Sequence, residues 1–269
     1  NFFRSELTRN SYGNSQKLKA IFKNSIDFLK ANPRLVIYWL LVNVFLFQLP
    51  LLLFANEPFG METIKTLPVI MILLLSGLIL TAGLIVVIKK ASRGLKWTAS
   101  GLLAAGWKNL FPYIIISIPV VIVSAILQQP FNLLSHALFA GRLPTFGIMV
   151  LLTVRVIIAS LRYLLIISVF IFVIKYGNWS LRIIVTGFKD FFKNYKEYLV
   201  FFPVLAIPHL LASYSLFGLS FIELPYVKAT FQIITVLVIS LVNLFVVTAI
   251  VFSFENYTGT ISQELQPGD

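Results

Sequence analysis

Two arginines, Arg155 and Arg162, are the residues of this sequence best placed to bind a ligand. Both fall inside one long apolar run, and residues seven positions apart share a face of a helix. An ionisable side chain at membrane depth costs at least about 2.5–3.5 kcal/mol on insertion scales, so it usually faces protein or water. No Asp or Glu falls in any of the apolar runs. We therefore expect both arginines to point inward, where an anionic ligand such as a lipid phosphate or carboxylate would satisfy them.

A purely structural role is the alternative for these arginines. Arg155 would then extend to the outer headgroups, while Arg162 would bond carbonyls or side-chain amides of neighbouring helices. Tyr163, next to Arg162, and His209, close to two prolines of another apolar run, belong to the same hypothesis. Prolines free backbone carbonyls, and broken helices frame some transport sites. A lone histidine or tyrosine in a span is also commonly a hydrogen-bonded packing residue.

The sequence offers little for catalysis or metal binding. It has no Cys, which excludes disulfides, thiolate metal sites and Cys nucleophiles, and its two His argue against a histidine metal site. It contains no Gly-rich phosphate loop, His-Glu zinc motif or serine elbow. We expect no catalytic residue, no metal, no cofactor and no enzymatic activity.

The elements that must position these residues are membrane helices. A hydrophobic content of 58% with 12% charged residues lies outside the range of soluble domains. Crossing the hydrocarbon core takes about 20 apolar residues, and helices satisfy every backbone amide within the segment. We predict an all-α bundle with six membrane helices in three hairpins, at Leu35–Ala55, Thr66–Ile88, Leu110–Leu127, Phe146–Ile174, Tyr198–Phe217 and Thr230–Phe254.

Lys and Arg are distributed very unequally between the connections. The segments 1–34, 88–109 and 175–197 hold seventeen of them, whereas the alternate connections hold only Lys65, Arg142 and Lys228. The positive-inside rule then places both termini in the cytoplasm, and we expect a bacterial inner (plasma) membrane protein. The net charge of +12 follows this pattern rather than one that favours nucleic acid.

Basic amphipathic segments precede each predicted hairpin. In the segment 180–198, apolar residues follow helical spacing and basic residues occupy the other side. Similar segments occupy 16–31 and, more weakly, 95–110. We expect helices in the headgroup plane that contact anionic lipid, or connectors packed beneath the bundle. The predicted membrane-surface basic residues are Lys19, Lys23, Lys30, Lys89, Lys90, Arg182, Lys189, Lys193 and Lys196.

These segments share a local pattern of Lys and Asn just before a span. Taking Lys30, Lys108 and Lys193 as equivalent gives spacings of 78 and 85 residues. The pattern predicts one membrane domain, 1–269, with repeat units 15–88, 93–174 and 179–254.

A family resemblance rests on the same segments. GFKDFFKNYKEYL runs straight into a span and is echoed by FKNSIDFLKANPRLVIYWLL. This layout resembles the membrane domain found with glycerophosphodiester phosphodiesterases and related uncharacterised bacterial six-helix families. The resemblance implies an integral membrane module that works beside or attached to another protein.

Two functions follow as expectations. The first is a non-enzymatic membrane subunit or scaffold that docks a partner protein within a larger complex. The alternative is a transporter or lipid-handling protein with an anionic ligand site near Arg155 and Arg162. An intramembrane enzyme is disfavoured, because only Ser, Tyr and one His are available within the spans.

Overall fold

The chain, seen in a computed structural model, is an all-helical integral membrane protein. The structure describes residues 2–54, 63–139, 145–176, 179–219 and 224–261, and no strand occurs in these ranges. The helices are α1 (Phe2–Ala31), α2 (Pro33–Phe54), α3 (Thr63–Ser92), α4 (Ala99–Lys108), α5 (Leu110–Phe139), α6 (Thr145–Tyr176), α7 (Leu181–Lys193), α8 (Tyr195–Leu199), α9 (Phe201–Leu219) and α10 (Pro225–Ile261).

Five stretches of the described chain are helical, long and apolar enough to cross a membrane. They are Leu75–Ser92, Leu110–Phe131, Gly147–Tyr176, Tyr195–Ser215 and Ala229–Phe254, and they confirm that apolar helices dominate the fold. The first predicted span corresponds to α2, whose apolar stretch Pro33–Val44 is shorter than a crossing within the residues searched. The predicted outer connections are 56–65, 128–145 and 218–229, and part of each lies outside the described residues. The helix α5 continues into the second of them, to Phe139, and the three-hairpin arrangement stays a prediction.

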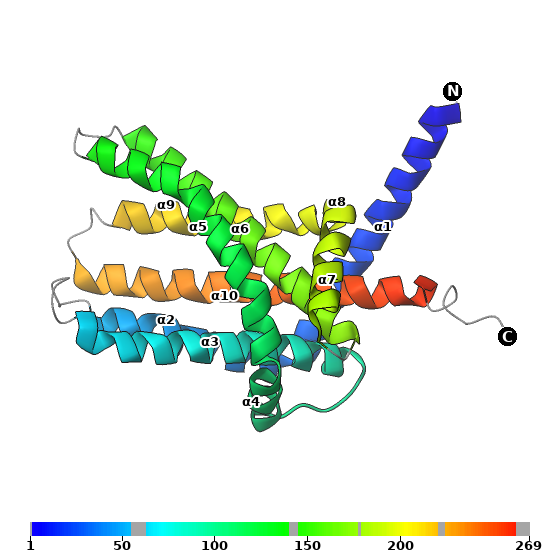
Figure 1. Ribbon diagram of the computed structural model, residues 1–269, viewed down its shortest axis with the longest axis horizontal. Coiled ribbons are helices and arrows are strands. Elements are labelled where there is room, and N and C mark those ends of the chain that lie inside the picture. The colour runs from blue at the N-terminus through cyan, green and yellow to red at the C-terminus, as the bar shows by residue number, and fades with distance from the viewer. Residues whose placement is uncertain (1, 55–62, 140–144, 177–178, 220–223, 262–269) are drawn as a thin grey trace.

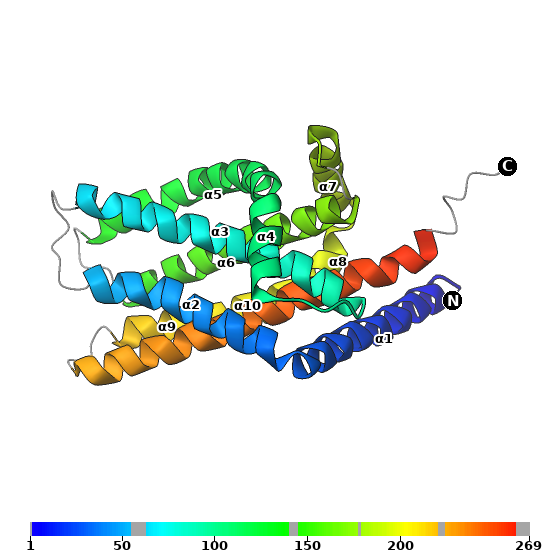
Figure 2. The ribbon, with the colours of Figure 1, turned by 90° about the horizontal axis from the view of Figure 1, so that it is seen from below.

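The helices α2, α3, α9 and α10 lie along one direction in Figure 1, and α5 and α6 run obliquely to them. The start of α1 and the end of α10 lie at the same end of the bundle (Figures 1 and 2). The short helices α4 and α7 lie across the long helices toward that end. Their helical starts are set by caps: the Thr98 hydroxyl accepts from Gly101 N at 3.0 Å, and the Ser180 hydroxyl accepts from Ile183 N at 3.3 Å. At the end of α3, Gly94 adopts a φ of +75°, which glycine takes without steric cost and which turns the chain toward α4.

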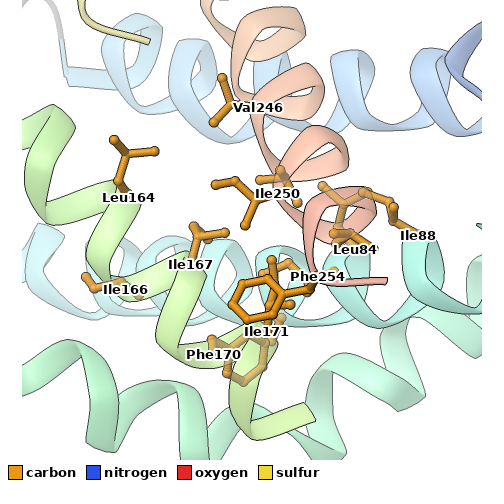
Figure 3. Packing of buried hydrophobic residues seen from close by; sticks show 14 of the residues in the cluster. Leu84, Ile88, Leu164, Ile166, Ile167, Phe170, Ile171, Val246, Ile250 and Phe254 are labelled. Atoms are coloured by element: carbon orange, nitrogen blue, oxygen red, sulfur yellow. The ribbon is translucent and has the colours of Figure 1, made fainter. Parts of the chain in front are cut away.

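Three helices, α3, α6 and α10, carry most of the core. Their facing ends are apolar and almost fully buried, as Figure 3 shows for Leu84, Ile171 and Ile250 among others. The outer helices α5 and α9 pack around them and bury a smaller share of their surface. The interior at the α4 and α7 end is therefore filled with side chains rather than open along its axis.

The helix α7 does not lie on the surface as a single amphipathic stripe. Ile184, Gly187 and Phe191 are buried, and a Cβ added at Gly187 would lie 3.2 Å from side-chain atoms of Phe172 and Val169 on α6. By contrast, the exposed fractions of Leu181 and Phe192 are 67% and 64%. The apolar face predicted from sequence is thus divided between packing on α6 and exposure on the outside.

The helix α1 is held by aromatic contacts to distant parts of the chain. The Phe22 ring lies 6.0 Å from Phe201 and 5.6 Å from Phe245, and Phe28 lies 5.6 Å from Phe252. These contacts hold the second half of α1 against α9 and α10. Of the two expectations for this segment, packing against the bundle therefore describes its apolar face, while Lys19, Lys23 and Lys30 remain exposed.

A single asparagine joins each of the helices α1, α4 and α7 to the helix that follows it. The side-chain amide of each Asn donates to the residue four positions earlier, and its carbonyl accepts from the first turn of the following helix. The pairs are Asn32 with Phe28 O at 2.9 Å, Asn109 with Ala105 O at 2.8 Å, and Asn194 with Asp190 Oδ1 at 3.0 Å. The same polar residue thus ends one helix and starts the next at three places in the chain.

Candidate anion-binding cavity

A cavity of about 460 Å³ lies among α3, α5, α6 and α9. Its residues belong to the first halves of α5 and α9 and to the middle of α6, so it sits in the half of the bundle nearer α4 and α7. The lining is Leu78, Tyr113, Ser117, Val121, Val156, Ala159, Ser160, Arg162, Tyr163, Ile166, Leu205 and His209. Three of the four residues predicted for an anionic site, Arg162, Tyr163 and His209, therefore line one cavity.

Arg162 lies midway along the 32-residue helix α6. A helix of that length measures about 48 Å, against about 30 Å of hydrocarbon, so its midpoint falls well inside the core. The side chain is half-buried and lines the cavity. No carboxylate belongs to the lining, so the Arg162 charge has no acidic partner within this described cavity.

His209 reaches the cavity from α9, where Pro208 interrupts the backbone ladder. Pro208 has no N–H, so the carbonyl of Val204 loses its helical partner. One residue later, His209 Nδ1 lies 2.7 Å from the carbonyl oxygen of Leu205. Because a carbonyl only accepts, Nδ1 carries the proton, and this contact fixes the ring while Nε2 is left for other partners.

The opposite wall comes from the first turns of α5. The Tyr113 ring packs edge-on against Phe170 at 4.8 Å, which holds it against α6. Ser117, one turn later, donates its hydroxyl to the Tyr113 carbonyl at 2.7 Å. The Ser117 hydroxyl proton is therefore bonded within α5. Toward other groups, the Ser117 oxygen can act only as a hydrogen-bond acceptor.

The cavity extends to the outside of the helices. Val121 lines it and is also exposed, while Arg162 and His209 are half-buried rather than enclosed. In a bilayer this surface of α5 meets acyl chains. A ligand could therefore enter sideways from the lipid.

Arg155 differs from the expectation that both arginines point inward. Its side chain is exposed and it does not line the cavity. It lies about 15 Å along α6 from Thr145, close to where the hydrocarbon begins if the helix is centred, so its long side chain can reach headgroups. Sharing a helical face with Arg162 did not bring both arginines into one site.

The predicted surface cations have different placements. Lys90, Arg182, Lys189, Lys193 and Lys196 are exposed on helices at the α4 and α7 end. Lys89 instead donates to the carbonyl of Ile174 at 3.0 Å, at the end of α6. A cation at a helix C-terminus satisfies an open carbonyl and interacts well with the helix dipole. Lys89 is therefore a contact between inner helices rather than a headgroup ligand.

Sequence reasoning missed Tyr113, Ser117 and Ser160. Each of the three lies in an apolar run, where a serine or tyrosine commonly forms a hydrogen bond within its own helix. Only the packing of α5 against α6 brings them to one cavity. The available signal was the polar spacing Tyr113–Ser117, one turn apart near the start of a span.

No protein family, curated protein or solved structure matches this chain.

Proposed function

We propose that this protein is a lipid-handling membrane protein that binds an anionic headgroup in the cavity around Arg162. The observation that carries this proposal is a cation midway along a membrane helix, lining a cavity without a carboxylate. Such a charge is expensive in lipid unless an anion or water satisfies it. Tyr163 on the same helix adds a further polar atom, and His209 on α9 and Tyr113 on α5 add others on the neighbouring walls.

A comparison within the chain supports a functional origin for Arg162. The inner helices α3, α6 and α10 share a serine four residues before a buried leucine, at Ser76–Leu80, Ser160–Leu164 and Ser240–Leu244. Two residues after the serine, α3 has Leu78 and α10 has Val242, where α6 has Arg162. The helix packing does not need a cation at this position, since both counterparts of Arg162 are aliphatic.

The filled interior between α3, α6 and α10 directs the proposal to the side of the bundle. Close-packed apolar side chains leave no room there for a polar path (Figure 3). The cavity lies between α5, α6 and α9 and reaches the exposed surface at Val121. Handling of lipid by lateral entry therefore fits this chain better than conduction along a central pore.

We infer that the chain crosses the membrane six times as three repeated units, with both termini in the cytoplasm of a bacterial cell. Two recurring features support the three repeated units. They are the asparagines that join α1, α4 and α7 to the next helix, and the serine four residues before a buried leucine in α3, α6 and α10. The excess of Lys and Arg on elements at the α4 and α7 end supports the orientation. In this orientation the cavity opens to the inner leaflet.

Native mass spectrometry on protein purified in mild detergent tests the binding proposal. Wild type should retain an anionic phospholipid, and Arg162→Gln should reduce the bound fraction at least about tenfold, because one charge-assisted contact is lost. Arg155→Gln is the matched control on the same helix and should retain the lipid. Equal retention by wild type and Arg162→Gln would overturn the proposal.

A second function, partner docking, is favoured by exposed aromatic residues near the basic helices. The exposed fraction of Trp107 is 66%, and the exposed rings of Phe111 and Trp179 lie 5.0 Å apart, edge to face. Aromatic residues of this kind are enriched in protein interfaces and also at membrane surfaces. The scaffold function requires that these aromatic residues form a protein interface.

Fluorescence quenching separates the two roles. In a variant that keeps only Trp107 or only Trp179, brominated lipids should quench the indole if it sits in the membrane interface. A scaffold surface should instead be quenched by acrylamide and protected by the partner protein. Quenching by lipid alone would remove the support for partner docking at this surface.

A further inference from the structure

Two residues of the cavity, His209 and Ser117, have their protons committed to their own helices. His209 Nδ1 donates to Leu205 O at 2.7 Å, so the uncharged ring presents Nε2 as an acceptor. Ser117 Oγ donates to Tyr113 O at 2.7 Å, so its oxygen presents lone pairs. Both residues line the cavity, one from α9 and one from α5.

These acceptors stand beside strong donors. Arg162 carries only N–H donors, and Tyr113 and Tyr163 bring hydroxyl groups. A ligand that is only an anion, such as a bare phosphate ester, would pair with the donors and leave the acceptors without partners. A bound ligand would shield these half-buried acceptors from water, and leaving them unpaired then costs free energy, so such a ligand is a poor match for this lining.

We propose that the cavity selects an anionic phosphodiester headgroup that also carries hydroxyl groups. This proposal rests on the proposed function and names the class of headgroup that the site recognises. The phosphate oxygens pair with Arg162 and the tyrosines, while the hydroxyls of the headgroup donate to both His209 Nε2 and Ser117 Oγ. The cavity volume, about 460 Å³, lies in the range of small-ligand sites and can hold such a headgroup.

The headgroup is carried by a lipid rather than by a free metabolite. The cavity lies among membrane-crossing helices and reaches the exposed surface at Val121, where acyl chains can lie along α5. A water-soluble ester of the same chemistry would have to cross apolar surface to arrive there. Lipid and soluble forms can be compared directly.

The experiment uses the full chain in phosphatidylcholine nanodiscs that contain either phosphatidylglycerol or phosphatidylmethanol with identical acyl chains. Both lipids carry one negative charge on a phosphodiester, and only phosphatidylglycerol has free hydroxyls. Binding is measured by native mass spectrometry of the ejected complex. Wild type should prefer phosphatidylglycerol by about fivefold or more, the value of one hydrogen bond.

Substitutions locate the preference. His209→Leu and Ser117→Ala should each reduce the preference toward unity while binding of phosphatidylmethanol is retained. Ser76→Ala is the matched control, because Ser76 bonds the carbonyl of Ile72 in the same way and does not line the cavity. This variant should keep the wild-type preference.

Each outcome bears on one proposal. Equal binding of the two lipids, lost in Arg162→Gln, would overturn hydroxyl selection and keep the anionic site. No anionic preference over phosphatidylcholine, unchanged in Arg162→Gln, would overturn the proposed function itself. Competition by soluble glycerophosphoglycerol, the deacylated phosphodiester of the same headgroup, at concentrations equal to the lipid would overturn the assignment to a lipid. A preference for phosphatidylglycerol that survives in both His209→Leu and Ser117→Ala would overturn the assignment of these two residues as the hydroxyl acceptors.

Discussion

Asp190 shows how one polar side chain fixes the junction between α7, α8 and α9. Its Oδ1 accepts from Asn194 Nδ2 at 3.0 Å, and its Oδ2 accepts from the Tyr198 hydroxyl at 3.1 Å. Tyr198 is buried and stacks on Phe191 at 4.9 Å. The carboxylate therefore ties the basic helix α7 to the start of the span that carries His209.

Replacing Asp190 by Ala should destabilise the protein by about 2 kcal/mol, because hydrogen bonds to a charged acceptor are worth about 1.5–3 kcal/mol. Tyr198→Phe, which removes one of the two bonds, should cost about 1 kcal/mol. Asp27→Ala, at an exposed acid on α1, is the control and should change little. Thermal unfolding in detergent measures all three. Equal melting temperatures for Asp190→Ala and Asp27→Ala would contradict this role.

Arg162 should behave differently in a stability measurement. Because α3 and α10 place Leu78 and Val242 at the equivalent position, Arg162→Leu should leave the melting temperature unchanged or raise it. The same variant should lose the bound anionic lipid. A large fall in melting temperature would show that Arg162 is a structural residue of the fold.

The individual site residues were only partly predictable. Charge and hydropathy alone identify Arg162, and prolines point to His209, because both are unusual inside an apolar run. The contribution of Tyr113 and Ser117 depends on how α5 packs against α6, which no local pattern encodes. The placement of Arg155 depends on helix depth rather than on the face it shares with Arg162.

Among the elements, α3 and α4 make the closest contact through glycine. A Cβ added at Gly83 would run into the carbonyl oxygen of Leu102, and one at Gly106 would run into that of Ile79. Both partners are backbone atoms, so only movement of the helices could relieve the clash. The position of α4 across the bundle thus depends on two residues without side chains.

Gly83→Ala and Gly106→Ala should each destabilise the protein by about 2 kcal/mol or more, as overpacking does in cores. Gly77→Ala is the matched control, since a Cβ there meets nothing within 4 Å and alanine favours the helix by about 0.5–1 kcal/mol. Its melting temperature should therefore equal or exceed that of wild type. Unfolding of the three variants in one detergent makes the comparison, and a Gly83→Ala variant as stable as Gly77→Ala would refute the close contact.

The elements were predicted better than their packing. Apolar length gives four of the spans within a few residues and overlaps a fifth, and helical spacing of apolar residues gives α7. Periodicity cannot tell which part of a wide apolar face meets protein and which meets lipid, because both are apolar surroundings. In α7, Ile184 is buried and Leu181 is exposed because only part of the apolar face contacts α6. The spacing of apolar residues in the sequence does not encode this contact.

For the whole molecule, the orientation in the membrane can be tested without removing native thiols, because the chain has no Cys. Lys189→Cys on α7 should react with a membrane-impermeant maleimide only in inside-out vesicles. Gly60→Cys, between the first two predicted spans, should react only from the outside of intact cells. Reaction of both positions from the same side would contradict the six-crossing topology.

The most direct measurement for the account as a whole is the location of bound lipid. A phosphatidylglycerol analogue with a photoreactive headgroup is irradiated with the protein in nanodiscs, and modified peptides are mapped by mass spectrometry. We predict adducts on the cavity-lining stretches of α5, α6 and α9, strongly reduced in Arg162→Gln and retained in Arg155→Gln. Adducts spread over the exposed helix faces, with the same yield in Arg162→Gln, would contradict a headgroup site in this cavity.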